Sequence, residues 1–353
     1  MSLPARTLLV GAARCAVLIA STLAGVMALV TWIGGGMYWA IELLRFVPYP
    51  AFLVPTVLAV ALSWRLGRAW RLLALVALAL VVGPVMGWRF ASPDTGFDKV
   101  RMMTFNIKSY LAQERFGGYA DIAEEIERHS PDLLVMQDAQ ILVSRPSSDA
   151  GKMMERALRG RELFMSGEYV VASRFPMRDC HAEDMSFGRH EREYVRCTVR
   201  VHGIDVDVVT AHFVSPREGL NAARHERFEG LDDWEQNFEN RVEQSGRLAR
   251  GITRRLRPII VAGDLNAAES SPIVRALLGT GLRDAFSVGG TGYGYTHGHS
   301  LRLGFSFLRI DHILVSADIG VQSSFAGGSN ASDHRPVIAD LWMMGDVSSA
   351  GSR

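Results

Sequence analysis

The feature that most constrains this chain is the apolar character of its first 90 residues. From Leu8 to Ala40 the only charged residue is Arg14. This run exceeds the roughly 20 apolar residues that cross a bilayer as a helix. Two further uncharged runs follow, and the first of them contains three prolines. The sequence therefore predicts a membrane anchor over residues 1–93 with about three transmembrane helices, at about 15–39, 46–64 and 72–88.

Aromatic and basic residues at the ends of these runs predict how they lie in a membrane. Trp and Tyr, which prefer the bilayer interface, cluster at the ends. Arg6 and Arg14 precede the first predicted span, and the link WRLGRAWR joins the second to the third. Because positive residues mark the cytoplasmic side, everything after Trp88 is expected outside, and a cleaved signal peptide in place of the first span would give the same result. We predict a multi-pass protein of the cell membrane, in contact with the lipid bilayer, whose C-terminal domain is extracytoplasmic.

Charge and cysteine content leave several functions open. The formal net charge of +1 provides neither a strongly basic field for nucleic acid nor an acidic field that would repel a phosphate substrate. Three cysteines without a CxxC pair are too few for a disulfide scaffold or a structural zinc site. Cys180 and Cys197 either pair, if the compartment is oxidising, or remain two buried thiols.

After residue 93 the pattern changes to short β-rich runs separated by polar helices, which predicts an α/β domain over residues 94–343. The runs expected as strands are VRMMTFNI, DLLVMQD, EYVVAS, YVRCTVRV, IDVDVVTAHF, PIIVAGDLN and IDHILVS. Helices are expected over YADIAEEIERHS, over GKMMERALRG and within residues 216–257. The tail, 344–353, is expected to be disordered.

Several of the expected strands end in a carboxylate, an amide or a histidine. These residues are Asn106, Asp138, His212, Asp264, Asn266, Asp311, Asp333 and His334. A sheet whose strands each deliver a polar side chain at one edge builds a site on rigid elements. Oxygen ligands of this kind suit Mg²⁺ or Mn²⁺ rather than zinc.

Seven motifs around these residues occur in an order that resembles the endonuclease/exonuclease/phosphatase superfamily, which includes DNase I-like nucleases, sphingomyelinases and inositol-phosphate phosphatases. The motifs are MMTFNI (102–107), LLVMQD (133–138), VVASRFPM (170–177), VVTAHF (208–213), VAGDLN (261–266), IDHILVS (310–316) and SDHRPVIADL (332–341). The resemblance implies a four-layer α/β sandwich, in which two mixed β-sheets pack face to face with helices outside.

The resemblance also implies a metal site. Asn106 and Asp138 would hold the ion, and Asp333 would orient the ion or the neighbouring histidine. Relatives usually have glutamate where this chain has Asp138, so the carboxylate here is one methylene shorter. Either the ion sits differently or binds more weakly, or a second carboxylate compensates, or the site is inactive.

The remaining residues would carry the reaction. By resemblance, Asp264 would position or deprotonate the attacking water, and Asn266 would bind a phosphate oxygen. His334 would contact the phosphoryl group with Asp311 hydrogen-bonded behind it, and His212 would stabilise the transition state or the leaving oxygen. In-line hydrolysis of a phosphate ester needs an activated water, neutralised charge on the equatorial oxygens and help for the leaving oxygen.

These residues predict a membrane-anchored, metal-dependent phosphoesterase that hydrolyses a phosphodiester. The alternative is a membrane-tethered binding module that keeps the fold without turnover. A tether favours a phospholipid substrate, yet nucleic acid outside the cytoplasm is equally within reach, so the substrate stays open. His297 and His299 either touch substrate or belong to a solvated, glycine-rich loop.

Overall fold

The computed structural model describes residues 3–33, 38–188, 190–225, 229–254 and 256–344. Part of the first predicted span, 34–37, and nearly all of the predicted disordered tail therefore lie outside the described residues. Contacts divide the chain into two compact units. One comprises Met1–Arg89 with Ser270–Pro272, and the other comprises Phe90–Glu269 with Ile273–Arg353.

The first unit is helical. Its elements are α1 (Leu3–Ile33), α2 (Trp39–Arg45), α3 (Pro50–Ser63), α4 (Arg68–Leu80) and the π-helical turn η1 (Val81–Val85). Small side chains lie where α1, α3 and α4 meet, among them Ala20, Ala59 and Ala74, all buried. Small residues let helix backbones approach closely, which is how helices associate inside lipid.

Two helical segments of this unit are long and apolar enough to cross a membrane, Thr7–Trp32 and Arg68–Val85. The middle predicted span, 46–64, contains α3 alone, which forms a bent pair with the preceding α2 at 68°. Pro48 and Pro50 explain the bend, because proline has no N–H to donate and disfavours the helical conformation in the residue before it. Alone, α3 would reach only about 21 Å at 1.5 Å per residue, short of a hydrocarbon core of about 30 Å.

The second unit contains twelve described strands in two sheets. The strands are β1 (Val100–Asn106), β2 (Leu133–Gln137), β3 (Glu162–Ser166), β4 (Tyr169–Ser173), β5 (Met177–Asp184), β6 (Glu193–Val201), β7 (Ile204–His212), β8 (Ile259–Asp264), β9 (Leu282–Asp284), β10 (Asp311–Ser316), β11 (Ile319–Ala326) and β12 (Val337–Met343). The first sheet has the order β11-β12-β1-β2-β4-β3 and the second has the order β5-β6-β7-β8-β10-β9. Each sheet has one parallel pair, β1 with β2 and β7 with β8, so both six-stranded sheets are mixed, as predicted.

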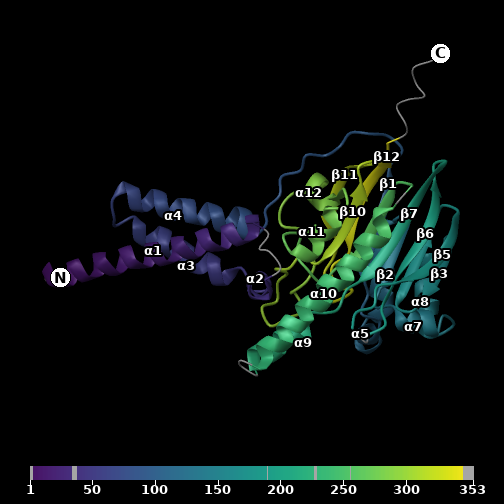
Figure 1. Ribbon diagram of the computed structural model, residues 1–353, viewed down its shortest axis with the longest axis horizontal. Helices are drawn as coiled ribbons and strands as arrows, with labels where there is room; N and C mark the ends of the chain where they lie inside the picture. The colour runs from purple at the N-terminus through teal and green to yellow at the C-terminus, as the bar shows by residue number, and fades with distance from the viewer. Residues whose placement is uncertain (1–2, 34–37, 189, 226–228, 255, 345–353) are drawn as a thin grey trace, which may run out of the picture. The chain divides into compact units, whose positions relative to one another are not determined.

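Helices flank these sheets (Figure 1). They are α5 (Ser109–Glu114), α6 (Gly118–His129), α7 (Gln140–Ser144), α8 (Asp149–Leu158), α9 (Arg217–His225), α10 (Glu229–Thr253), α11 (Pro272–Leu278) and α12 (Ala285–Gly289). Strand β1 shows how the layers form, because alternate side chains point to opposite faces. Met102 packs into the core between the sheets, whereas Met103 packs into the core that includes Ile122 and Ile126 of α6. On the second sheet, Arg196 of β6 donates to the Gly251 carbonyl of α10 at 3.0 Å.

Five strands, β3, β5, β9, β11 and β12, were not expected as strands, although β12 lies within the last motif. The edge strand β5 reads MRDCHAED and has no buried residue. An edge strand with polar side chains lacks the apolar alternation on which strand prediction depends.

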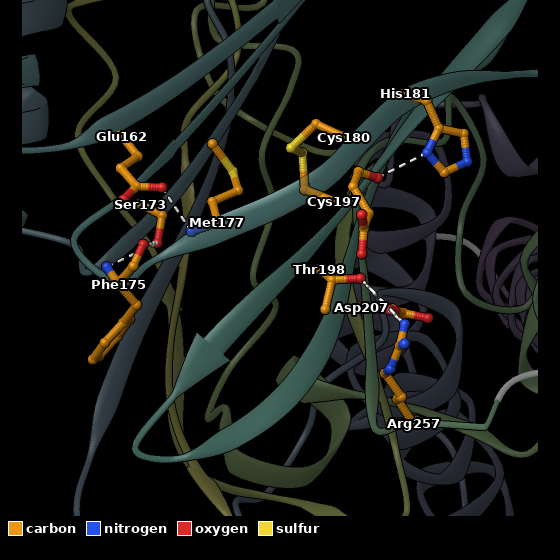
Figure 2. Close-up of a disulfide and its surroundings, with 11 residues drawn as sticks. Glu162, Ser173, Phe175, Met177, Cys180, His181, Cys197, Thr198, Asp207 and Arg257 are labelled. Atoms are coloured by element: carbon orange, nitrogen blue, oxygen red, sulfur yellow. Dashed lines mark hydrogen bonds and ion pairs between the residues drawn. A yellow bond between two sulfur atoms is a disulfide. The ribbon is translucent and has the colours of Figure 1, made fainter.

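Cys180 of β5 and Cys197 of β6 form a disulfide, with their Cα atoms 4.1 Å apart (Figure 2). The two strands pair in antiparallel fashion, and the register shifts between Arg178 and His181, where Cys180 lies. Of the two alternatives left open by the sequence, the structure therefore contains the bridge, and Cys15 is the free thiol.

The bridge predicts how many thiols react. The denatured full-length chain should take up one maleimide-polyethylene glycol without reductant and three with it, since the chain has three cysteines. A Cys15→Ser variant should take up none before reduction. Three adducts on the unreduced wild-type chain would contradict the bridge.

Candidate active site

Three of the predicted residues form a row across the second sheet. Asp264 of β8 is the register partner of His212 on β7 and of Asp311 on β10. Asn106, at the end of β1 in the other sheet, donates its side-chain amide to Asp264 Oδ2 at 2.9 Å. Asn106 and Asp264 are fully buried. The site therefore lies where the ends of the central strands of both sheets meet.

Asp264 is the centre of this group. Its Oδ1 accepts from the backbone N–H of Asn266 at 3.0 Å, and its Oδ2 lies 3.6 Å from His212 Nε2 and 3.7 Å from His334 Nδ1. Among the described residues, Asp264, Asp311 and His334 place potential ligand atoms within 4.8 Å of one another. Two carboxylates and an imidazole are a donor set that fits a divalent cation.

This group differs from the predicted metal ligands. Asp138 is paired with Lys108, whose Nζ lies 2.8 Å from Asp138 Oδ2. Burial alone would raise the pKa of Asp138, but Lys108 and His212 outweigh it and hold that pKa below its ordinary value. Asp333 is paired with Arg115 at 2.5 Å and is partly exposed. Of the three predicted ligands, only Asn106 makes a hydrogen bond to a member of the group.

His334 and Asp311 make the contact that the resemblance implies. His334 Nδ1 donates to Asp311 Oδ2 at 3.0 Å. Burial lowers the pKa of His334 to about 4 and raises the pKa of Asp311 to about 6. At neutral pH, His334 is therefore an uncharged imidazole with its proton on Nδ1, which leaves Nε2 as the acceptor facing away from Asp311.

The loop with His297 and His299 packs against this pair. His297 Nδ1 donates to the Asp333 carbonyl at 3.1 Å, and its ring centre lies 4.6 Å from that of His334. His299 Nε2 lies 3.0 Å from the Ser332 carbonyl. Both rings are therefore held by the segment that carries His334, and the loop is not merely solvated.

His212 has the opposite environment to His334. Its Nδ1 donates to Glu168 Oε2 at 2.9 Å. Burial alone would lower the pKa of His212, but Glu168 and Asp264 outweigh it and raise that pKa above 6.5. Among the described residues its Nε2 is buried and has no hydrogen-bond partner, and it points toward the Asp264 carboxylate. This shift favours the protonated ring, whose Nε2 proton would face Asp264.

Asn266 is anchored more firmly than its predicted role requires. It adopts a left-handed conformation with φ of 48°, and its Nδ2 donates to the Phe213 carbonyl at 2.9 Å. Its own carbonyl accepts from the buried Arg241 at 2.9 Å. A phosphate contact through Nδ2 would have to share or replace the bond to Phe213.

Sequence reasoning missed two residues of this site, Lys108 and Glu168. Both lie just outside a strand, Lys108 two residues after Asn106 and Glu168 directly before β4. Glu168 begins the EYVVAS run, so an acidic residue next to a buried strand was the available signal. No comparable signal marks Lys108.

The sequence matches the profile of the Endonuclease/Exonuclease/phosphatase family over residues 103–334. The chain belongs to this family. Its members are phosphoester hydrolases that generally use a divalent metal. Among curated proteins no match is found.

Solved structures of the family share the fold. A family protein from Bacteroides thetaiotaomicron is 17% identical with a TM-score of 0.52, and the match covers 69% of this chain and 94% of that one. D. rerio TDP2, complexed with a single-strand DNA product, is 14% identical with a TM-score of 0.53, over 70% of this chain and all of its own. A mannosyl-6-phosphatase from B. thetaiotaomicron is 16% identical with a TM-score of 0.50, and the match covers 69% of this chain and 100% of that one.

The ion pair between Glu168 and His212 predicts a measurable pKa. A histidine-selective ¹⁵N NMR titration of the chain in detergent should place the pKa of His212 above 6.5. Glu168→Gln should lower this pKa, because burial then opposes the charged ring with less compensation. Glu155→Gln, on the exposed face of α8, should leave it unchanged. An unaltered His212 titration in Glu168→Gln would refute the pairing.

Proposed function

We propose that this chain is a membrane-anchored phosphodiesterase that uses Mg²⁺ or Mn²⁺ and acts outside the cytoplasm. The observation that carries the proposal is the contrast between the two histidines beside Asp264. Against the effect of burial, Glu168 raises the pKa of His212, whereas burial lowers the pKa of His334 to about 4. Titratable groups driven apart in this way are typical of acid and base assignments. This arrangement favours an enzyme over a binding module.

Each side chain then has a task. Asp264, fixed by Asn106 and by the Asn266 backbone, positions the attacking water and accepts its proton. His212 donates its Nε2 proton to the leaving oxygen, and Glu168 keeps the ring charged and oriented. A divalent ion held by the carboxylates of Asp264 and Asp311 would neutralise the negative charge that develops on the phosphoryl oxygens, and uncharged His334 would contact the phosphoryl group. Asp138, paired with Lys108, is a further candidate ligand of the ion, and Asp333 is paired with Arg115.

Three observations support the extracytoplasmic side. Disulfides such as that between Cys180 and Cys197 form and persist in oxidising compartments. Arg65, Arg68 and Arg71 lie directly before α4 and in its first turn, as expected at a cytoplasmic end. If the bent α2–α3 pair counts as one span, three crossings carry the second unit to the side opposite the N-terminus. The bilayer would then be a constant partner of the chain.

The orientation can be tested by labelling intact cells with a membrane-impermeant maleimide. In a Cys15→Ser background, a cysteine in place of the exposed Ser300 should react at once. A cysteine in place of Ala69, in the arginine-rich link, should react only after the membrane is permeabilised. The reverse pattern would place the catalytic domain in the cytoplasm.

Hydrolysis can be tested with purified full-length protein on plasmid DNA, RNA, a chromogenic phosphodiester, sphingomyelin and phosphoinositides, with Mg²⁺, Mn²⁺ or chelator. We expect metal-dependent turnover of at least one substrate, which names the substrate class. Asp264→Asn should lower the rate by about 10² to 10⁴, the range typical of a lost acid or base. Asp318→Asn, on an exposed turn, is the matched control.

Two results would count against the proposal. Turnover that survives both chelator and Asp264→Asn would refute the assigned chemistry. No turnover on the whole panel, together with no metal binding by calorimetry, would favour the tethered binding module, a reading consistent with the cationic partners of Asp138 and Asp333.

A further inference from the structure

The position of Lys108 follows from the pairing of β1 with β2. The two strands are parallel, and Asn106 is the register partner of Gln137. After each of these strands the backbone turns sharply at a residue in the left-handed conformation, with φ of 47° at Lys108 and 56° at Asp138. Residues with a side chain seldom adopt this conformation, so it marks a constrained segment.

Hydrogen bonds between the two turns hold them together. Ile107 N–H donates to the Gln137 carbonyl at 3.1 Å, and Ser109 N–H donates to the Asp138 carbonyl at 2.8 Å. The Lys108 N–H donates to Asn106 Oδ1 at 3.2 Å. The Lys108 side chain therefore starts from a fixed backbone and reaches Asp138 Oδ2 at 2.8 Å.

The charges around Lys108 are those of the candidate metal centre. Burial alone would lower the pKa of Lys108, but Asp138, Asp264 and Asp311 outweigh it and raise that pKa. An ammonium in this position neutralises the same carboxylates that would attract a divalent cation. Lysine suits such a role, because its ammonium is a compact charge on a flexible stem and can move without disturbing the backbone.

We propose that Lys108 and a divalent cation compete for Asp138. Without the ion, the ammonium occupies Asp138 and balances the buried carboxylates. When the ion binds, Asp138 becomes available to it only if Lys108 withdraws, so Lys108 weakens the affinity of the site for metal. This inference rests on the proposed function in one respect, the use of a divalent ion.

Mn²⁺ binding to the chelator-stripped, full-length protein in detergent tests the competition by calorimetry, without any substrate. Lys108→Met removes the charge and keeps an unbranched apolar stem. The variant protein should bind Mn²⁺ about 10-fold more tightly than wild type. This is the lower end of the change in metal affinity that residues next to metal ligands typically cause. Lys108→Gln should behave in the same direction and decides the matter if Lys108→Met does not fold. Lys152→Met removes an exposed lysine of α8 and should change nothing.

A double-mutant cycle separates competition at Asp138 from a general effect of charge. In an Asp138→Asn background, Lys108→Met should give no gain in Mn²⁺ affinity. A gain that persists without Asp138 would overturn the proposal, as would equal affinities of wild type and Lys108→Met. If the two affinities are equal, wild type still binds metal and the proposed function stands. If neither protein binds Mn²⁺, the inference and the metal dependence both fail.

Discussion

The hydrogen bond from Asn106 to Asp264 is the contact on which the site depends, because it joins the central strands of two separate sheets. It connects two fully buried polar groups, and a buried polar group without a partner is strongly unfavourable. In a second bond between the sheets, Gln137 Nε2 of the first sheet donates to Thr210 Oγ1 of the second at 2.9 Å. The Tyr169 hydroxyl also joins the sheets, because it accepts from the His212 N–H and donates to the Glu193 carbonyl. Together these bonds fix how the two sheets meet at this edge. The residues proposed as acid, base and metal ligands all take their positions from that junction.

The row of His212, Asp264 and Asp311 shows why one sheet edge can support opposite protonation states. The two histidines are both buried, and burial alone would make both neutral. Glu168 reverses this for His212, whereas His334 faces Asp311, whose own pKa burial raises to about 6. Glu168, which pairs with His212 alone, therefore separates the pKa values of the two rings. This distinction could not be made from residue types alone.

What the sequence predicts, and what it does not, follows from where each interaction originates. Strand-ending residues such as Asn106, Asp264 and His334 were identifiable because a buried strand and its terminal polar residue are adjacent in the chain. Lys108 and Glu168 act through pairings between segments about 30 and 44 residues apart, which no local pattern encodes. The edge strand β5 was not predicted for the same reason, since its pairing with β6 and its disulfide depend on contacts between separate segments of the chain. The prolines that bend the second predicted span were visible, but whether the bent pair crosses a membrane depends on more than composition.

The carboxylates of this site create a conflict that any metal-using phosphodiesterase must resolve. Several acids in one buried cluster repel one another before the ion arrives, and the folded chain has to remain stable in that state. Here Lys108 and Arg115 provide internal cations for Asp138 and Asp333, so the metal-free site is balanced by the chain itself. Under the proposed function, a site balanced in this way would hold the ion less tightly, because the internal cations must be displaced or tolerated. Metal occupancy would then follow the ion concentration on the side of the membrane where the domain is proposed to lie.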